Sequence, residues 1–234
     1  MIVRHHQIDF ASGALVFPGG KVDDGDGEVR SFCEGVDNLQ DRSVSLMVGA
    51  IREAFEECGV LLARKRGETN VISGEKLTSL EHYRDQLNKG EISIAQFLEK
   101  ENLILACDLL QPFAHWITPE MMPKRFDTHF YLAVAPEDHV AIHDGHESVD
   151  SIWISPKDAL VGADEGNYTI IFPTRLNIEM LSESESVESA MELAIKRPIA
   201  PVLPWMDKRE DGMYLCIPSD AGYQISETKM ENTP

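Results

Sequence analysis

The chain has 234 residues, of which 40 are acidic and 21 basic, and its formal net charge is -19. This charge repels nucleic acids and anionic membranes, so neither is an expected partner, and a polyanionic substrate would need bound cations. The four cysteines lie far apart and no apolar run approaches the roughly 18 residues of a membrane span, so we expect a reduced, cytoplasmic, globular protein.

The first expected elements are two β-prone runs, residues 2–4 and 14–17, and the second stops at the Pro-Gly-Gly turn of residues 18–20. From there to about residue 43 the chain is polar, glycine-bearing and without a firm period. We interpret this stretch as a loop with room for a helical turn.

A helix of about four turns is predicted next, in the stretch SVSLMVGAIREAFEECGVLLA. Gly59 supplies a left-handed stop at its end. Its apolar residues recur at steps of three and four: Val44, Met47, Val48, Ile51, Phe55 and Cys58.

The rest of the chain predicts further helices and strands in alternating groups. Helices are expected at 75–90, 93–102, 155–163, 174–184 and 186–197, and strands at 103–110, 113–119, 125–136 and 213–220. We expect Ser93 to cap the second of these helices. The order predicts an α/β fold, a mixed sheet between helices, in a single domain of residues 1–234 with a helical insertion at 67–101.

Three carboxylates share one side of the predicted helix. Glu53, Glu56 and Glu57 are separated by steps that keep them together, and three like charges within a turn repel each other. Arg52 can pair with Glu56, but one guanidinium does not balance three carboxylates. A hard divalent cation, Mg2+ or Mn2+, would do so. The alternative is a solvated acidic face, which is common in so acidic a chain.

The glycine turn, a spaced acid and the string R-E-A-F-E-E-C-G-V of residues 52–60 together resemble the Nudix box, whose second half is R-E-U-x-E-E-x-G-U with U aliphatic. Asp26 stands at the box's first glutamate, and residues 27–51 fill a gap that is much shorter in the family. This interruption resembles one branch, the peroxisomal acyl-coenzyme A diphosphatases and their bacterial relatives. Further matching stretches are 125–133, 151–160, 172–174 and 217–223.

The resemblance implies a Nudix fold and hydrolysis of a nucleoside diphosphate linked to another moiety, by attack of water on the pyrophosphate. It implies Glu56 and Glu57 as the principal ligands of Mg2+ or Mn2+, with Glu53 as a third ligand. Arg52 would orient these glutamates through a salt bridge, with Asp26 as its partner.

The resemblance also implies substrate contacts and a catalytic base. The backbone of Gly19 and Gly20 would position a ligand carbonyl or phosphate. The base would be Glu53 or Glu57 of the box, or an acid on a later loop, for which Glu147 is the candidate. In that segment His143 and His146 lack the zincin order and a third ligand, so we do not expect zinc there.

Coenzyme A-cleaving relatives carry a second signature before the box, which Gly13 and residues 17–20 fit, with Arg4 on its first arginine. Asp9 replaces the second arginine, which removes a charge-assisted contact to an anionic ligand. This departure counts against coenzyme A, but the rest of the signature keeps coenzyme A or its acyl esters as the leading substrates, with ADP-ribose, dinucleotide polyphosphates and NADH as alternatives.

Other cations have two interpretations each. Arg125 precedes a strand and either contacts phosphate or guards a sheet edge. The run of residues 64–66 either neutralises the preceding helix C-terminus or grips a phosphate.

The sequence leaves two alternatives to a hydrolase and predicts one protein partner. A Nudix-fold sensor would bind a nucleotide without turnover, but it has no need for three mutually repelling acids. An isomerase would need a catalytic cysteine, and Cys58 lies on the apolar side of the helix. By the resemblance, relatives have a strand and turn before the position of Met1. Either this sequence starts late or a sheet edge is left for another subunit, and on the second alternative we expect a homodimer.

Overall fold

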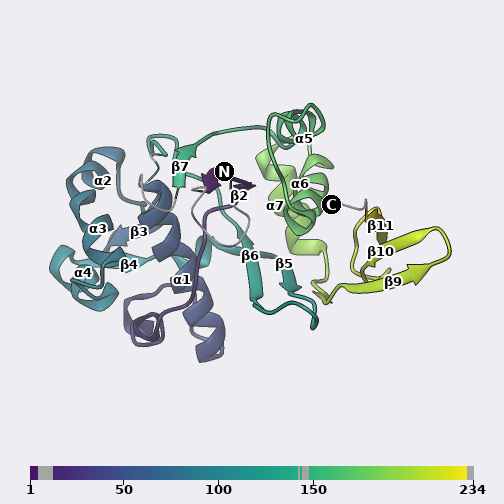
Figure 1. The fold of residues 1–234 in the computed structure, drawn as a ribbon. Coiled ribbons are helices and arrows are strands. Elements are labelled where there is room, and N and C mark those ends of the chain that lie inside the picture. Colours follow the sequence, from purple (N-terminus) through teal and green to yellow (C-terminus); the bar gives the residue numbers. More distant parts are fainter. Residues whose placement is uncertain (5–12, 142, 144–147, 231–234) are drawn as a thin grey trace. The chain divides into compact units, whose positions relative to one another are not determined.

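The computed structural model describes residues 1–4, 13–141, 143 and 148–230. These residues form the predicted mixed α/β fold (Figure 1). They divide into two compact units, residues 1–110 with 133–174 and residues 111–132 with 175–234. The single domain with an insertion at 67–101 stays a prediction. None of the helices described is long and apolar enough to cross a membrane.

In the first unit, β1 (Ile2–Arg4) pairs antiparallel with both β2 (Leu15–Val16) and β7 (Ser148–Ser151). A separate antiparallel pair joins β3 (Ala63–Lys65) to β4 (Leu103–Leu105). The strand predicted at 103–110 therefore ends early, because the chain turns into a 3-10 helix at Cys107–Leu109.

The predicted long helix is α1 (Asp41–Cys58). Gly59 follows it with φ 71°, the left-handed conformation that glycine adopts without strain. The polar stretch before it contains two short 3-10 helices, Asp24–Gly27 and Arg30–Phe32, so it holds more than a single turn.

The segment after β3 is helical as predicted, but its first helix is divided in two. Its helices are α2 (Gly74–Leu80), α3 (His82–Asn88) and α4 (Ile94–Glu101). The Ser93 hydroxyl caps α4 by accepting from the Gln96 main-chain nitrogen at 3.2 Å.

Aromatic packing joins this segment to α1. The ring of Phe55 on α1 lies 5.6 Å from that of Phe97 on α4, and Tyr83 on α3 lies 5.0 Å from Phe97. Burial of three aromatic rings fixes α3 and α4 against α1. Further along, α5 (Pro156–Asp164) begins as predicted, with Ser155 as its cap.

The second unit contains a sheet in the order β6-β5-β8, made of β5 (Gln111–Ile117), β6 (Asp127–Leu132) and β8 (Pro201–Val202). α7 (Val187–Lys196) contacts β5. α6 (Phe172–Ser182) enters this unit from Arg175 onward. A second sheet joins β9 (Trp205–Arg209), β10 (Gly212–Cys216) and β11 (Glu227–Met230), of which only β10 was predicted.

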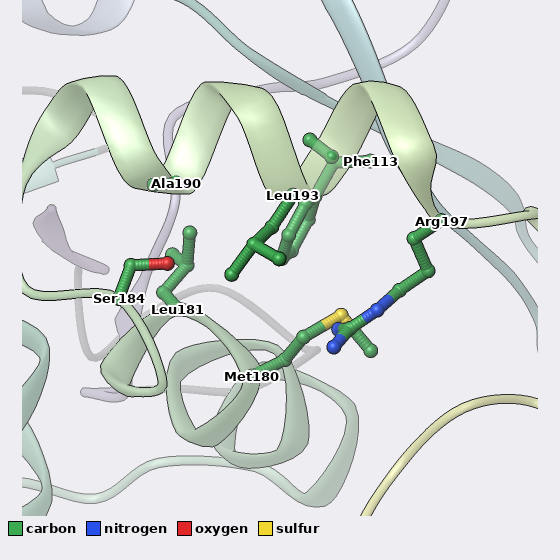
Figure 2. A pocket seen from close by; sticks show the side chains of 8 residues that line it. Phe113, Met180, Leu181, Ser184, Ala190, Leu193 and Arg197 are labelled. Carbon is green, nitrogen blue, oxygen red and sulfur yellow. The ribbon is translucent and has the colours of Figure 1, made fainter.

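A small cavity lies between α6 and α7 in this unit (Figure 2). It is lined chiefly by apolar side chains such as Phe113, Met180 and Leu193, and its volume of about 10 Å³ holds at most one water. It is therefore a packing defect, far too small for a nucleotide.

Candidate active site

The core of the site is a buried ion pair between α1 and the 3-10 helix Asp24–Gly27. Arg52 Nε donates to Asp26 Oδ1 at 2.9 Å, and Arg52 Nη2 donates to Asp26 Oδ2 at 3.0 Å. Asp26 is fully buried and Arg52 is 5% exposed, so this forked pair is shielded from water. The structure thus contains the predicted pair and joins the two halves of the interrupted box.

The same guanidinium also reaches the glutamates of α1. Arg52 Nη1 donates to Glu53 Oε1 at 3.0 Å and to Glu56 Oε1 at 3.3 Å, while Nη2 also donates to the Lys21 carbonyl at 2.7 Å. Arg52 therefore fixes two carboxylates relative to Asp26.

The third glutamate is held by the glycine turn. The Gly19 main-chain nitrogen donates to Glu57 Oε2 at 2.6 Å, and Glu57 is 2% exposed. An ionised carboxylate offers about four acceptor sites, so an oxygen that accepts a hydrogen bond can also bind a cation.

Two glycines allow the chain to approach these carboxylates closely. A Cβ on Gly20 would lie 2.5 Å from the Glu53 carboxylate, and one on Gly49 would lie 3.1 Å from Asp26 Oδ2. Only glycine leaves room for Glu53 in its observed position. The second glycine after Pro18 therefore has a steric reason, whereas Gly19 has a positive φ of 153°.

Electrostatically the site has an excess of negative charge. Burial raises the pKa of Glu56 to about 7, with Arg52 opposing and Glu53 adding to the rise. Burial alone would lower the pKa of Arg52, but its hydrogen bond to Asp26 and the surrounding carboxylates hold that pKa above the ordinary value. Arg52 is ion-paired with four carboxylates, because Asp23 Oδ2 also lies 3.8 Å from its Nη2, so a bound cation would be stabilised.

The end of α1 is held by a helix that sequence analysis did not connect with the site. Arg84 on α3 donates from Nε and Nη2 to the Glu56 main-chain oxygen, at 3.1 and 3.0 Å. This oxygen belongs to the last turn of α1, where carbonyls lack partners within the helix. The helical segment therefore braces the turn that carries Glu56 and Glu57.

The other predicted site residues belong to other elements or lie outside the described residues. Glu147 lies outside the described residues, as does His146. Arg4 lies on β1, and its buried Nε has no hydrogen-bond partner among the described residues. Arg125 belongs to the second unit, is exposed, and donates from Nε to the Thr118 carbonyl at 3.2 Å.

For Arg64, the first residue of the run 64–66, both predicted roles are wrong: it neither neutralises the C-terminus of α1 nor is free to grip a phosphate. Arg64 lies in β3, where its Nη1 is 2.6 Å from both Glu34 and Asp108. Its side chain is 8% exposed and ties β3 to two acidic residues rather than to α1 or to a phosphate. Cys58 is buried, and its thiol donates to the Ala54 carbonyl within α1.

Comparison with known proteins decides the family. The model of the NUDT19 Nudix domain matches residues 33–178, more than half of the chain. The chain is a Nudix hydrolase of this family. The match begins after Asp26 and the glycine turn. The hydrogen bonds of Arg52 with Asp26 and of Gly19 with Glu57 connect these earlier residues with the second half of the box.

Individual relatives agree with this assignment. A Caenorhabditis elegans protein that carries the name nudix hydrolase 7 is 28% identical over 232 residues, covering 99% of this chain and 71% of that protein. The acyl-coenzyme A diphosphatase NUDT19 of Xenopus laevis is 22% identical, covering 95% and 70%. The crystal structure of a NUDIX hydrolase from Alicyclobacillus acidocaldarius has a TM-score of 0.68 and 26% identity, covering 82% and 86%.

Sequence analysis missed one cluster of titratable side chains in this Nudix hydrolase. His115, Asp127 and His129 gather on β5 and β6. The signal was present, because Asp127 and His129 are two apart on a predicted strand and so share a face. Their pairing with His115 depends on strand register, which sequence alone does not reveal.

Proposed function

We propose that this Nudix hydrolase cleaves the pyrophosphate of coenzyme A or its acyl esters with Mg2+ or Mn2+ held by the glutamates of α1. The observation that carries the proposal is the buried Arg52–Asp26 pair, which completes an interrupted box of the acyl-coenzyme A diphosphatase type. The name of the Xenopus relative supports the substrate class.

The chemistry of the donor set fits a hard divalent cation. Glu53, Glu56 and Glu57 offer only carboxylate oxygens, the ligands that suit Mg2+ and Mn2+. When bound, such an ion polarises phosphoryl oxygens and makes water more acidic. The burial of Glu56 and Glu57 keeps bulk water from competing for the same oxygens.

The residues of the site have separate roles in this proposal. Arg52 and Asp26 orient the glutamates, and Glu53 or Glu57 accepts a proton from the attacking water. The glycine turn at Gly19 sets the position of Glu57 through its main-chain nitrogen. Arg4, whose Nε is buried without a described partner, is proposed as a contact to a substrate phosphate.

The same proposal includes an alternative base, two further substrate contacts and a partner. Glu147 is kept as an alternative base, because the family uses a later loop in some members. Gly20 and Arg125 are kept as substrate contacts. A homodimer also stays a prediction.

The test is hydrolysis of a substrate panel with Mg2+ or Mn2+: coenzyme A, acetyl-coenzyme A, ADP-ribose, NADH and diadenosine polyphosphates. We expect the highest kcat/KM for coenzyme A or its acetyl ester, with cleavage into a nucleoside bisphosphate and a phosphopantetheine. Chelation of the metal should stop the reaction.

A preference for ADP-ribose or a dinucleotide would overturn the substrate class and leave the hydrolase intact. Turnover that persists after complete chelation would instead overturn the metal assignment. An Arg4→Gln variant separates substrate contact from catalysis, because it should raise KM more than it lowers kcat.

A further inference from the structure

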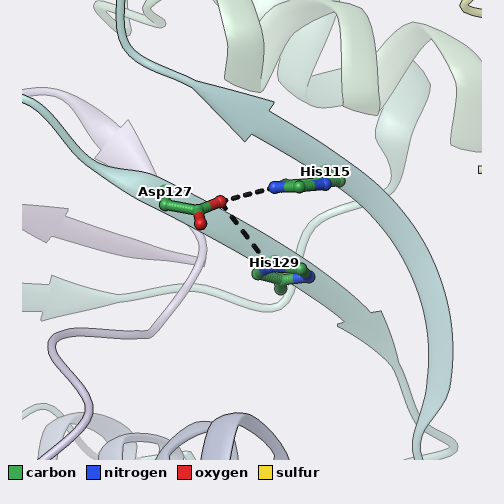
Figure 3. Close-up of side chains that lie close together, drawn as sticks. All are labelled: His115, Asp127 and His129. Carbon is green, nitrogen blue, oxygen red and sulfur yellow. Dashed lines mark hydrogen bonds and ion pairs between the residues drawn. The ribbon is translucent and has the colours of Figure 1, made fainter. Parts of the chain in front are cut away.

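A group of side chains of the types that ligate metals lies on the hairpin of β5 and β6, and it shares no residue with the glutamates of α1. His115, Asp127 and His129 each offer one ligand atom, and these atoms all lie within 4.8 Å of one another. Figure 3 shows the three side chains turned toward one another from the two strands. The proposed hydrolysis uses none of them.

Strand register brings the three residues together. His115 on β5 is paired directly with His129 on β6, and Asp127 lies two residues before His129. Side chains two apart project from the same face of a strand, so all three share one face of the hairpin. The strands are joined by six aligned residue pairs, which fix the main chain before any ligand arrives.

Both histidines approach the same oxygen of Asp127. His115 Nε2 donates to Asp127 Oδ1 at 2.5 Å, and His129 Nε2 lies 3.6 Å from the same oxygen. The two imidazole rings are stacked with centroids 4.0 Å apart. The nitrogen atoms that would bind an ion are therefore directed toward one carboxylate oxygen.

We propose that His115, Asp127 and His129 bind one transition-metal ion, with Zn2+ as the ion that fits. Two imidazoles and a carboxylate are a ligand set of zinc sites that keep an open position. Imidazole nitrogen favours Zn2+, Fe2+, Ni2+ or Cu2+ over Mg2+. This site would therefore take a different ion from the carboxylates of α1.

The geometry requires only a small adjustment. Ligand bonds of about 2.1 Å in a tetrahedral site place ligand atoms roughly 3.4 Å apart, close to the 3.6 Å between His129 Nε2 and Asp127 Oδ1. His115 and Asp127 would move apart by less than about 1 Å as the ion takes the place of their hydrogen bond. The proton of each ligating imidazole would then reside on Nδ1.

Solvent can reach the cluster. The side chains of His115, Asp127 and His129 are 18%, 41% and 27% exposed. An ion can enter without unfolding of the hairpin, and water can take the position that the protein leaves open.

The test is equilibrium dialysis of chelator-stripped protein against Zn2+, with excess Mg2+ present to occupy the carboxylates of α1. We expect one equivalent of Zn2+ on the unmodified protein. His115→Gln and His129→Gln should each bind at least about tenfold more weakly, because each removes one of three ligands. The matched control is His82→Gln, an exposed histidine on α3, and it should bind as the unmodified protein does.

A loss smaller than tenfold in both variants, an equal loss in the control, or no Zn2+ on the unmodified protein would overturn the proposal. Co2+ gives a readout that needs no variant. A visible d–d spectrum without a thiolate charge-transfer band supports the nitrogen and oxygen ligands, while a thiolate band would assign the ion to cysteine and contradict it.

Discussion

Arg84 of α3 donates two hydrogen bonds to the main-chain oxygen of Glu56, on the turn of α1 that carries the proposed metal ligands. The Arg84 side chain is 9% exposed, so water cannot easily replace these bonds. Although Arg84 lies in the helical segment predicted as an insertion, it acts on the geometry of the active site.

Replacement of Arg84 by Met should therefore weaken the site without removing any ligand. Loss of hydrogen bonds from a charged donor to a buried carbonyl costs about 1.5–3 kcal/mol of folding free energy. We expect a weaker apparent affinity for Mg2+ and a lower kcat, measured by metal titration of activity. Lys89→Met, which removes only an exposed pair with Asp85, should change neither. Equal behaviour of the two variants would contradict this role.

Gly20→Ala should reduce activity more than stability. The added Cβ would lie 2.5 Å from the Glu53 carboxylate, which is the movable end of a side chain, so the fold can adapt by displacing Glu53. We expect kcat/KM to fall at least about tenfold while the thermal midpoint stays nearly constant. Gly25→Ala is the control, since its Cβ would meet only a side-chain methyl at 3.9 Å. A fall in stability that matches the loss of activity would argue against this steric explanation.

The metal-free protein should lose stability as the pH rises from about 4.5 to about 7. The pKa of Glu56 is about 7 in the folded chain against an ordinary 4.5, so between these values the folded state binds the proton more tightly than the unfolded state. The free energy of unfolding then falls as pH rises through this window. Glu56→Gln carries no titrating group and should not share this loss.

Thermal midpoints in the presence of chelator, measured below and above this window, check the prediction. The thermal midpoint of Glu56→Gln minus that of the unmodified protein should be larger above about pH 7 than below about pH 4.5. A difference that stays constant with pH would mean that burial of the Glu56 charge is compensated fully by Arg52.

In the second unit, Tyr223 links two buried polar groups. It accepts a hydrogen bond from Trp116 Nε1 and donates one to Asn177 Oδ1, both at 2.7 Å, and burial raises its pKa to about 12. Tyr223→Phe removes both bonds while the ring remains. We expect a loss of roughly 1–3 kcal/mol in the free energy of unfolding, measured by urea denaturation.

Tyr214→Phe is the matched control for this experiment. Its hydroxyl donates to Asp211 at the surface, where water can replace the lost bond, so it should cost under about 0.5 kcal/mol. Similar losses in the free energy of unfolding for the two variants would show that the buried hydrogen bonds of Tyr223 add no more stability than a bond at the surface.

The helices were accessible to sequence analysis because their signals are local. The apolar steps of α1, the stop at Gly59 and the cap at Ser93 all lie within one or two turns of what they determine. The resemblance to the Nudix box also identified the partner of Arg52, although Asp26 lies far from it in sequence.

The missed features depend on contacts between distant segments. β9 and β11 are short and partly charged, and they become strands by pairing with β10. Arg84 gives no sequence signal for its contact with Glu56, and His115 meets His129 only through the register of β5 and β6. Tertiary contacts decided these features, and no local pattern encodes them.

The most direct test of the central claim is metal-dependent cleavage of coenzyme A by four proteins: the unmodified chain, Glu56→Gln, Glu57→Gln and the control Glu28→Gln at an exposed position. We predict Mg2+- or Mn2+-dependent turnover by the unmodified chain and the control, and a loss of at least about a hundredfold in kcat/KM for the other two. Undiminished turnover by Glu56→Gln and Glu57→Gln would contradict the account, because the carboxylates of α1 would then not hold the catalytic ion.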